Sequence, residues 1–262
     1  MKVVVCAKQT PSTTAVFSVD DAGAVSWDDP GGKPNVLNPW DEFTVEEGIR
    51  LKENHGASDV IALTMGDEDS KEALKTALAM GCTEAVLVSD PAFAGIDALG
   101  TAKVLAAAIN NIGDVSVAIF GKQAIDGDTG QTAVQTARKL GWTPLTFVSE
   151  IKEIGDGSIT VERLLDDGKE TVTAPLPAVI SVVKEINDPR YPSFMGIRKA
   201  GRAKIPVWGA DDLGVDGIGS KVDWSHVYAT PPREGEVEMI EGDSVADKAA
   251  KLVDKLYEEK VI

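Results

Sequence analysis

The sequence has only two cysteines, two histidines and 5% aromatic residues. Cys6 and Cys82 are too few to form the disulfide framework of a small secreted domain. His55 and His226 stand apart from any cysteine or acid at metal-ligand spacing, which argues against a zinc site. With so few aromatic side chains, the core must consist of aliphatic layers of the kind that cover parallel sheets.

Basic residues are also scarce. The chain carries 26 Lys and Arg against 42 Asp and Glu, a formal net charge of −16. This deficit disfavours nucleic acid and anionic lipid surfaces as partners, because both are held by an excess of positive charge. No apolar run reaches the roughly 18 residues of a membrane span, and the N-terminus has neither a signal-peptide nor a transit-peptide pattern. The sequence therefore predicts a cytoplasmic protein without direct membrane insertion.

Common catalytic motifs are missing as well. The sequence has no G-x-S-x-G elbow, no G-x-x-x-x-G-K-[ST] loop and no G-x-G-x-x-G after its first apolar run. The acids are so numerous that no pair of them stands out as a general acid and base. We expect no catalytic residue and no metal site.

Strand-like aliphatic runs alternate with helical periodicity over the first 150 residues. Such an alternation predicts parallel strands joined by right-handed crossovers, with helices on both faces. The expected strands are 3–7, 60–65, 85–88 and 115–120, and the expected helices are about 41–52, 70–80, 97–109 and a last one ending at residue 140. The fold class is α/β, with a doubly wound, mostly parallel sheet.

The pattern changes after Trp142. Residues 159–165 and 170–173 flank Asp166, Asp167 and Gly168, which predicts an antiparallel hairpin added to the sheet. Residues 177–183 form an aliphatic strand expected to return to the sheet. Few periodic elements follow until 244–259, so we expect an extended C-terminal arm, either covered by a partner or folded back on its own domain. The predicted units are a nucleotide-binding domain over 1–206 and the arm over 207–262.

One loop stands where parallel-sheet proteins bind phosphate. Residues 121–132 follow an aliphatic strand and open a helix, with glycines that allow close approach of backbone N–H groups to an anion. Asp126 and Asp128 would repel a phosphate, so we expect them to cap the helix, bind ribose hydroxyls or meet cations of a partner. An ordinary Gly/Asp-rich turn explains the composition equally well.

A second segment of interest is the helix entry at Asn38 and Pro39. A residue before proline is held extended, and we expect this to direct the Asn38 amide outward. The first strand ends at Ala7 and Lys8, and the next ends at Met65 and Gly66. In a doubly wound sheet these ends open on one edge, so four segments are expected to converge on one crevice.

The third feature is a basic segment in an acidic chain. Between Pro189 and Pro206 there are five basic residues and no acid, and Tyr191, Phe194 and Met195 lie among prolines and glycine. An apolar tip with a positive rim suits an anchor for an acidic protein partner. A solvated basic turn with aromatic side chains folded inward is the alternative, and RNA binding is disfavoured by the remaining charge.

These motifs together resemble the β subunit of electron-transfer flavoproteins over essentially the whole chain. The similar stretches are 3–8 (VVVCAK), the Asn38-Pro39 entry, 77–81 (ALAMG), the loop 121–132, the hairpin and strand 161–181, and 188–200 (DPRYPSFMGIRKA). The last stretch resembles the loop with which the family docks acyl-CoA-type dehydrogenases.

The resemblance implies a heterodimer with an α subunit that carries FAD, while the β subunit binds AMP in simple carriers and FAD in electron-bifurcating ones. For this chain it favours FAD, with NADH as an electron donor. It implies an electron carrier rather than a conventional enzyme, since the flavin supplies the chemistry. A non-redox adenine-nucleotide sensor of the universal-stress type is the alternative.

Carried over position by position, the resemblance implies two sets of residues. The cofactor-binding set is Cys6, Ala7, Asn38, Pro39, Trp40, Asp41, Met65, Gly121, Lys122, Gln123, Ala124, Ile125, Asp126, Gly127, Asp128, Thr129, Gly130, Gln131 and Thr132. The partner-docking set is Arg190, Tyr191, Phe194, Met195, Arg198 and Lys199, with Phe194 as the expected anchor.

Overall fold

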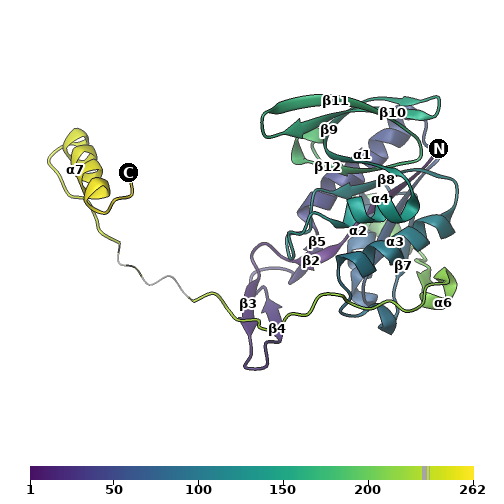
Figure 1. Ribbon diagram of the computed structural model, residues 1–262, viewed down its shortest axis with the longest axis horizontal. Helices are drawn as coiled ribbons and strands as arrows, with labels where there is room; N and C mark the ends of the chain where they lie inside the picture. Colours follow the sequence, from purple (N-terminus) through teal and green to yellow (C-terminus); the bar gives the residue numbers. More distant parts are fainter. Residues whose placement is uncertain (232–234, 236) are drawn as a thin grey trace. The chain divides into compact units, whose positions relative to one another are not determined.

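A nine-stranded sheet organises the computed structural model of the chain, which describes residues 1–231, 235 and 237–262 (Figure 1). The strand order is β11-β10-β9-β12-β8-β1-β6-β7-β13. The strands are β1 (Lys2–Cys6), β6 (Asp59–Met65), β7 (Glu84–Val88), β8 (Val115–Gly121), β9 (Thr143–Gly155), β10 (Ser158–Leu165), β11 (Gly168–Pro175), β12 (Ala178–Val182) and β13 (Val207–Trp208).

The central strands of this sheet are parallel, and only β9, β10 and β11 form antiparallel pairs with one another. After β1 the chain builds outward through β6 and β7, then crosses back to place β8 on the other side of β1. The strand order therefore reverses between β1 and β8, which is where doubly wound sheets open a crevice for ligands.

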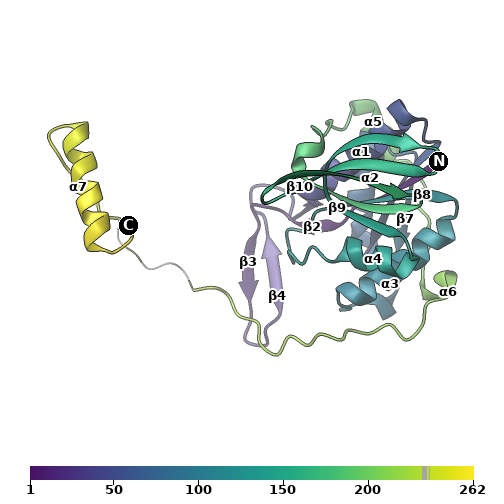
Figure 2. The same ribbon diagram turned by 45° about the horizontal axis from the view of Figure 1, so that its top comes forward.

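Helices cover both faces of the sheet (Figure 2). Buried side chains of α1 (Pro39–His55) and α2 (Lys71–Met80) share one core cluster with Val3 and Val5 of β1. Those of α3 (Ala98–Ile112) and α4 (Thr132–Leu140) share the second cluster with Val4 and Cys6. Successive residues of a strand point to opposite faces, so the run of valines in β1 supplies both cores. The prediction of a doubly wound α/β fold is confirmed.

The predicted hairpin is present as β10 and β11, and β9 extends it by a third antiparallel strand that the sequence did not indicate. Two small antiparallel pairs were also missed: β2 (Gln9–Pro11) with β5 (Asn35–Leu37), and β3 (Val16–Val19) with β4 (Val25–Asp28). Strands of three or four residues are too short to show periodicity. In β9 the apolar residues alternate with polar ones only irregularly, because the pairing register shifts along it.

The basic segment contains a helix where a loop was expected. The helix is α5 (Phe194–Ala200). Ser193 caps its N-terminus, because the Ser193 side chain accepts a hydrogen bond of 2.9 Å from the N–H of Gly196. The helix packs on α2, and a Cβ at Gly196 would overlap the carbonyl oxygen of Ala79. Glycine is required there because the two helix backbones approach closely.

Short elements connect this framework. They are the 3₁₀ turns Glu68–Ser70, Pro91–Phe93 and Lys184–Ile186, and the helix α6 (Ala210–Leu213), which contacts α3. The first compact unit runs from Met1 to Val227. The expected boundary at residue 206 lies inside this unit, because β13 pairs with β7 and α6 packs on α3.

The second unit, Tyr228–Ile262, contains α7 (Val245–Glu258). The bounds of this helix agree within one residue with those expected, 244–259. Ser244 caps it by accepting from the N–H of Asp247 at 3.1 Å. Within the predicted arm, residues 232–234 and 236 lie outside the described residues. Across the part of the chain that the structure describes, every helix is too short or too polar to cross a bilayer.

Gly48 of α1 provides a test of the packing between helix and sheet. A Cβ there would lie 2.5 Å from Cγ1 of Val5 and 2.9 Å from Cγ1 of Val60. Alanine is favoured over glycine in a helix by about 1 kcal/mol. Overpacking nevertheless outweighs this gain, and we expect Gly48→Ala to lower the free energy of unfolding by about 1 to 3 kcal/mol in chemical denaturation.

The matched control is Gly219→Ala, since a Cβ at Gly219 meets nothing within 4 Å. It is expected to change the free energy of unfolding by less than about 0.5 kcal/mol. A Gly48→Ala protein as stable as the wild type would contradict this account of the α1 interface.

Candidate functional site

A cavity of about 400 Å³ lies at the carboxyl ends of β1, β6 and β8. Its volume is within the range of small-ligand sites, about 300 to 1,000 Å³. Most of the predicted cofactor-binding residues line it: Cys6, Ala7, Asn38, Asp41, Met65, Gly121, Lys122, Gln123, Ala124, Asp126, Gly127, Asp128, Thr129, Gly130, Gln131 and Thr132. Pro39, Trp40 and Ile125 are not among the lining residues.

Another part of the cavity lining was not among the residues expected from the sequence. It comes from the turn after β7 and the first two turns of α3, and consists of Phe93, Gly95, Ile96, Asp97, Ala98, Thr101 and Leu105. Asp97 caps α3 by accepting a 2.8 Å hydrogen bond from the N–H of Gly100. Because α3 follows a strand of the same parallel sheet, its first residues lie at this edge. The order of strands and helices in the sequence therefore predicts their position, although no motif marks these residues.

Asn38 fastens the loop 121–132 to the end of β1. Its side-chain Nδ2 donates to the carbonyl of Gln123 at 2.9 Å, and its Oδ1 accepts from the N–H of Ile125 at 3.2 Å. Its own N–H donates to the carbonyl of Lys8 at 2.9 Å. The side chain is 1% exposed. The expectation that this amide points outward is therefore wrong: loop backbone groups offer it buried partners, and buried amides must be paired.

Asp41 is a second buried polar group of the cavity wall. The N–H of Lys8 donates to its Oδ2 at 2.8 Å. Burial raises the pKa of Asp41 to about 7, against the opposing effect of hydrogen bonds from Lys8, Asn38 and Gly121. A Cβ at Gly121 would overlap this carboxylate, so glycine is needed where β8 passes α1. Burial, and secondarily the charge of Asp41, raise the pKa of the Cys6 thiol, which stays protonated.

The two aspartates of the loop are held by groups of this chain. Asp126 pairs with Lys8, whose Nζ lies 2.7 Å from Oδ2. Asp128 accepts from Nε2 of Gln123 at 2.7 Å. Neither caps α4, which begins after Gln131 without a side-chain cap. The repulsion that these acids would exert on a phosphate is thus reduced by groups of this chain, and the cation beside Asp126 is Lys8, which follows β1.

Lys122 lies between two aromatic rings. Its Nζ is 5.4 Å from the ring centroid of Trp40 and 5.8 Å from that of Phe147, both within cation–π range. Phe147 has a φ of 57°, a rare conformation for a bulky residue. The ammonium group is therefore positioned by Trp40, a residue assigned to the cofactor, and by Phe147, which no sequence pattern indicated.

Thr64, on β6, offers an unused polar group at the cavity. Its side chain is buried, and among the described residues its hydroxyl has no hydrogen-bond partner. A buried hydroxyl without a partner costs free energy unless a ligand or water satisfies it. This fits a polar ligand in the cavity.

The predicted docking residues lie apart from the cavity lining, mostly on α5. Tyr191, Phe194 and Met195 are 93%, 82% and 69% exposed, so the alternative of inward-folded aromatic side chains is wrong. Arg198 and Lys199 are also exposed. Arg190 differs from the rest of this set, since its guanidinium is paired with two carboxylates of α1.

Comparison with known proteins identifies the family. The family model "Electron transfer flavoprotein domain" matches residues 30–213. The chain belongs to the electron transfer flavoprotein family. It is 38% identical to the "Caffeyl-CoA reductase-Etf complex subunit CarD" of Acetobacterium woodii and 37% identical to the "Electron transfer flavoprotein subunit beta" of Clostridium acetobutylicum, over the whole of each chain. It is 32% identical to "Protein FixA" of Azorhizobium caulinodans, over 97% of this chain and 93% of that one.

The electron transfer flavoprotein relatives confirm the resemblance seen in the sequence. They match along the full length of the chain and include β subunits by name. The prediction of an electron-transferring β subunit is confirmed at this level, and the universal-stress-type sensor is not favoured.

Asp41, in the cavity wall, makes the stability of the fold depend on pH. Because its pKa in the folded chain is about 7 against 3.8 for a free aspartate, the folded state retains a proton between these values that the unfolded state has lost. This contribution to stability is full at low pH and is lost as the pH rises through 7. Between pH 5 and pH 8, the nucleotide-free wild type should lose about 2 to 3 kcal/mol more than Asp41→Asn in urea unfolding. Parallel pH profiles of the two proteins would refute the assignment.

Proposed function

We propose that the chain is the β subunit of a heterodimeric electron-transfer flavoprotein that holds FAD in the cavity at the ends of β1, β6 and β8. The single observation that carries this proposal is the cavity at the reversal of strand order, where the segments predicted to bind a nucleotide converge. The 38% identity to a subunit of an Etf complex supports it.

The residues suited to the phosphates of the nucleotide are in the loop 121–132 and the start of α4. Successive backbone N–H groups and the positive end of a helix favour an anion there. The hydroxyls of Thr129 and Thr132 line the cavity beside them, and the Lys8 pair with Asp126 offsets the charge of that acid. When bound, the flavin supplies the electron chemistry, and the protein supplies its position and electrostatic surroundings.

The choice of FAD over AMP rests on space. The residues from Asp126 to Thr129 are small, and a Cβ at Gly127 would meet nothing within 4 Å. The cavity also reaches from Asn38 and Asp41 to the start of α3. Such room suits a nucleotide that continues beyond its adenosine phosphates. With FAD here, NADH is the proposed electron donor, and electrons divide between two acceptors.

Two surfaces are proposed to meet partners. The exposed side chains of α5 dock an acyl-CoA-type dehydrogenase, a class that fits the naming of the CarD relative as part of a caffeyl-CoA reductase complex. The arm packs on the α subunit: in α7, Leu252 and Val253 are exposed together with Val245 and Tyr257. Amphipathic helices without a core of their own are stabilised by such packing.

Nucleotide content is the experiment that tests the proposed function. The purified heterodimer should contain two flavins, one of them in this chain, as counted by absorbance after acid release and by mass spectrometry. A heterodimer that contains one flavin and one AMP would still agree with an electron carrier, but it would exclude FAD in this cavity. A colourless homodimer without nucleotide would refute the proposal entirely.

The docking role of α5 is tested by Phe194→Ala. Removing this 82% exposed ring should raise the KM of the heterodimer for a purified acyl-CoA dehydrogenase about tenfold or more, the scale expected for a central anchor residue. Flavin content should not change, because Phe194 is not among the residues lining the cavity. Phe17→Ala is the matched control, another exposed phenylalanine, on β3. Unchanged electron exchange in Phe194→Ala would remove the anchor assignment.

A further inference from the structure

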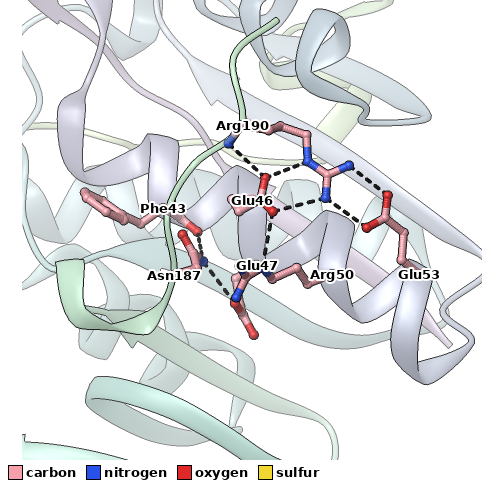
Figure 3. A network of polar contacts seen from close by, with 7 residues as sticks. All are labelled: Phe43, Glu46, Glu47, Arg50, Glu53, Asn187 and Arg190. Atoms are coloured by element: carbon pink, nitrogen blue, oxygen red, sulfur yellow. Dashed lines mark hydrogen bonds and ion pairs between the residues drawn. The ribbon is translucent and has the colours of Figure 1, made fainter.

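The first basic residue of the docking segment, Arg190, points back at its own domain (Figure 3). Its Nε donates to Glu46 at 2.7 Å, and Nη2 donates to the other oxygen of Glu46 at 3.0 Å. Nη1 and Nη2 donate to the two oxygens of Glu53 at 2.7 and 2.8 Å. The backbone N–H of Arg190 also donates to Glu46, at 3.2 Å. We call this arrangement the Arg190 clasp.

Both carboxylates of the clasp lie on α1. Glu46, Arg50 and Glu53 follow one another at helical spacing and therefore share one face of the helix. Arg50 also donates to Glu46, at 3.2 Å. The Glu46 side chain is only 4% exposed, whereas that of Glu53 is 50% exposed. A planar guanidinium between two fixed carboxylates forms the strong, directional kind of ion pair.

A neighbouring contact anchors the chain just before the clasp. Nδ2 of Asn187 donates to the carbonyl of Phe43 at 3.0 Å and to Glu47 at 2.9 Å, again on α1 (Figure 3). The two carboxylates of the clasp keep their charge. Burial would raise the pKa of Glu46, but its hydrogen bonds with Arg190 outweigh this and lower the pKa. Hydrogen bonds from Arg190 likewise lower the pKa of Glu53. Both carboxylates thus remain charged throughout the neutral range.

Charge neutralisation separates Arg190 from the other basic residues of the segment. Its charge is offset by Glu46 and Glu53, so it adds little to the positive field that would attract an acidic partner. Arg198 and Lys199, by contrast, are exposed at the end of α5. The polar contacts of Arg190 are used within the chain, on a helix far away in the sequence.

The clasp fixes the start of the chain segment that follows Arg190. Tyr191 and Phe194 lie within the next four residues, and their side chains are largely exposed. The next fixed point is Gly196, whose close approach to Ala79 seats α5 on α2. The exposed residues are thus held between two attachment points. An apolar tip that is ordered before docking binds more tightly, because less conformational freedom is lost on association.

We propose that Arg190 is a positioning residue: paired with Glu46 and Glu53 of α1, it holds the segment 191–199 in a docking-ready conformation and does not itself contact the partner. This deepens the proposed docking role of α5 and rests on it. Arg190 belongs to the docking set expected from the sequence, but in this proposal it orders the docking segment instead of touching the partner.

The first test measures order in the free heterodimer and needs no partner. Hydrogen exchange of the peptide amides in 191–199 should become about tenfold faster in Arg190→Gln. In Glu53→Gln it should become faster by a smaller factor, because Arg190 keeps its hydrogen bonds to Glu46. The double variant should be no faster than Arg190→Gln alone, because Glu53 acts on the segment only through Arg190. Arg190→Lys should restore exchange only in part, since lysine lacks the two-pronged geometry.

The control is Glu150→Gln, which removes a carboxylate paired with Lys152 on β9. It should leave the exchange of 191–199 unchanged. Glu53 is half exposed, so its variant is expected to fold normally and keeps the test informative if Arg190→Gln does not. Wild-type exchange rates in Glu53→Gln would overturn the proposal.

The second test separates positioning from direct contact. With a purified acyl-CoA dehydrogenase as the probe, both Arg190→Gln and Glu53→Gln should raise KM about three- to tenfold, with kcat and flavin content unchanged. If Arg190→Gln raises KM while Glu53→Gln does not, Arg190 touches the partner and the proposal is wrong. A wild-type heterodimer that exchanges no electrons with the dehydrogenase would count against the proposed function instead, while the exchange experiment still decides on the clasp.

Discussion

The candidate site depends on the buried hydrogen bonds of Asn38. This one amide joins the start of α1 to the loop after β8, with the end of β1 held beside them through the backbone. Because Pro39 fixes the backbone just after it, the side chain reaches the loop from a rigid helix entry. The nearby carboxylate of Asp41 reinforces the same junction through Lys8. The cavity walls are thus positioned by contacts within the chain.

Much of the site was predictable because its positions follow from strand ends. Apolar runs locate the parallel strands, and once their order reverses, Cys6, Met65 and Gly121 must lie on one edge. The direction of the Asn38 amide was not predictable, since its partners lie 85 and 87 residues away in the sequence. The wall from Phe93 to Leu105 carries no composition signal, and neither does the conformation of Phe147.

The same limit applies to the docking segment. Its composition indicated an exposed apolar tip with basic residues, and the exposure of Tyr191 and Phe194 agrees. The seven residues of α5 are too few to show helical periodicity. The pairing of Arg190 with Glu46 spans 144 residues, so a count of charges could not separate it from Arg198. Position in three dimensions distinguishes the residue that orders the segment from those that are free to meet a partner.

The proposed function rests on the contacts of Asn38, which shape the cavity proposed for a nucleotide. The most direct measurement is calorimetric titration of FAD into the flavin-stripped heterodimer, comparing wild type with Asn38→Ala and with Asn110→Ala, an exposed asparagine on α3. We predict one site in this chain, weakened about tenfold or more by Asn38→Ala through the loss of buried hydrogen bonds, and unaffected by Asn110→Ala. Equal affinities in all three proteins, or no binding in the wild type, would contradict the account.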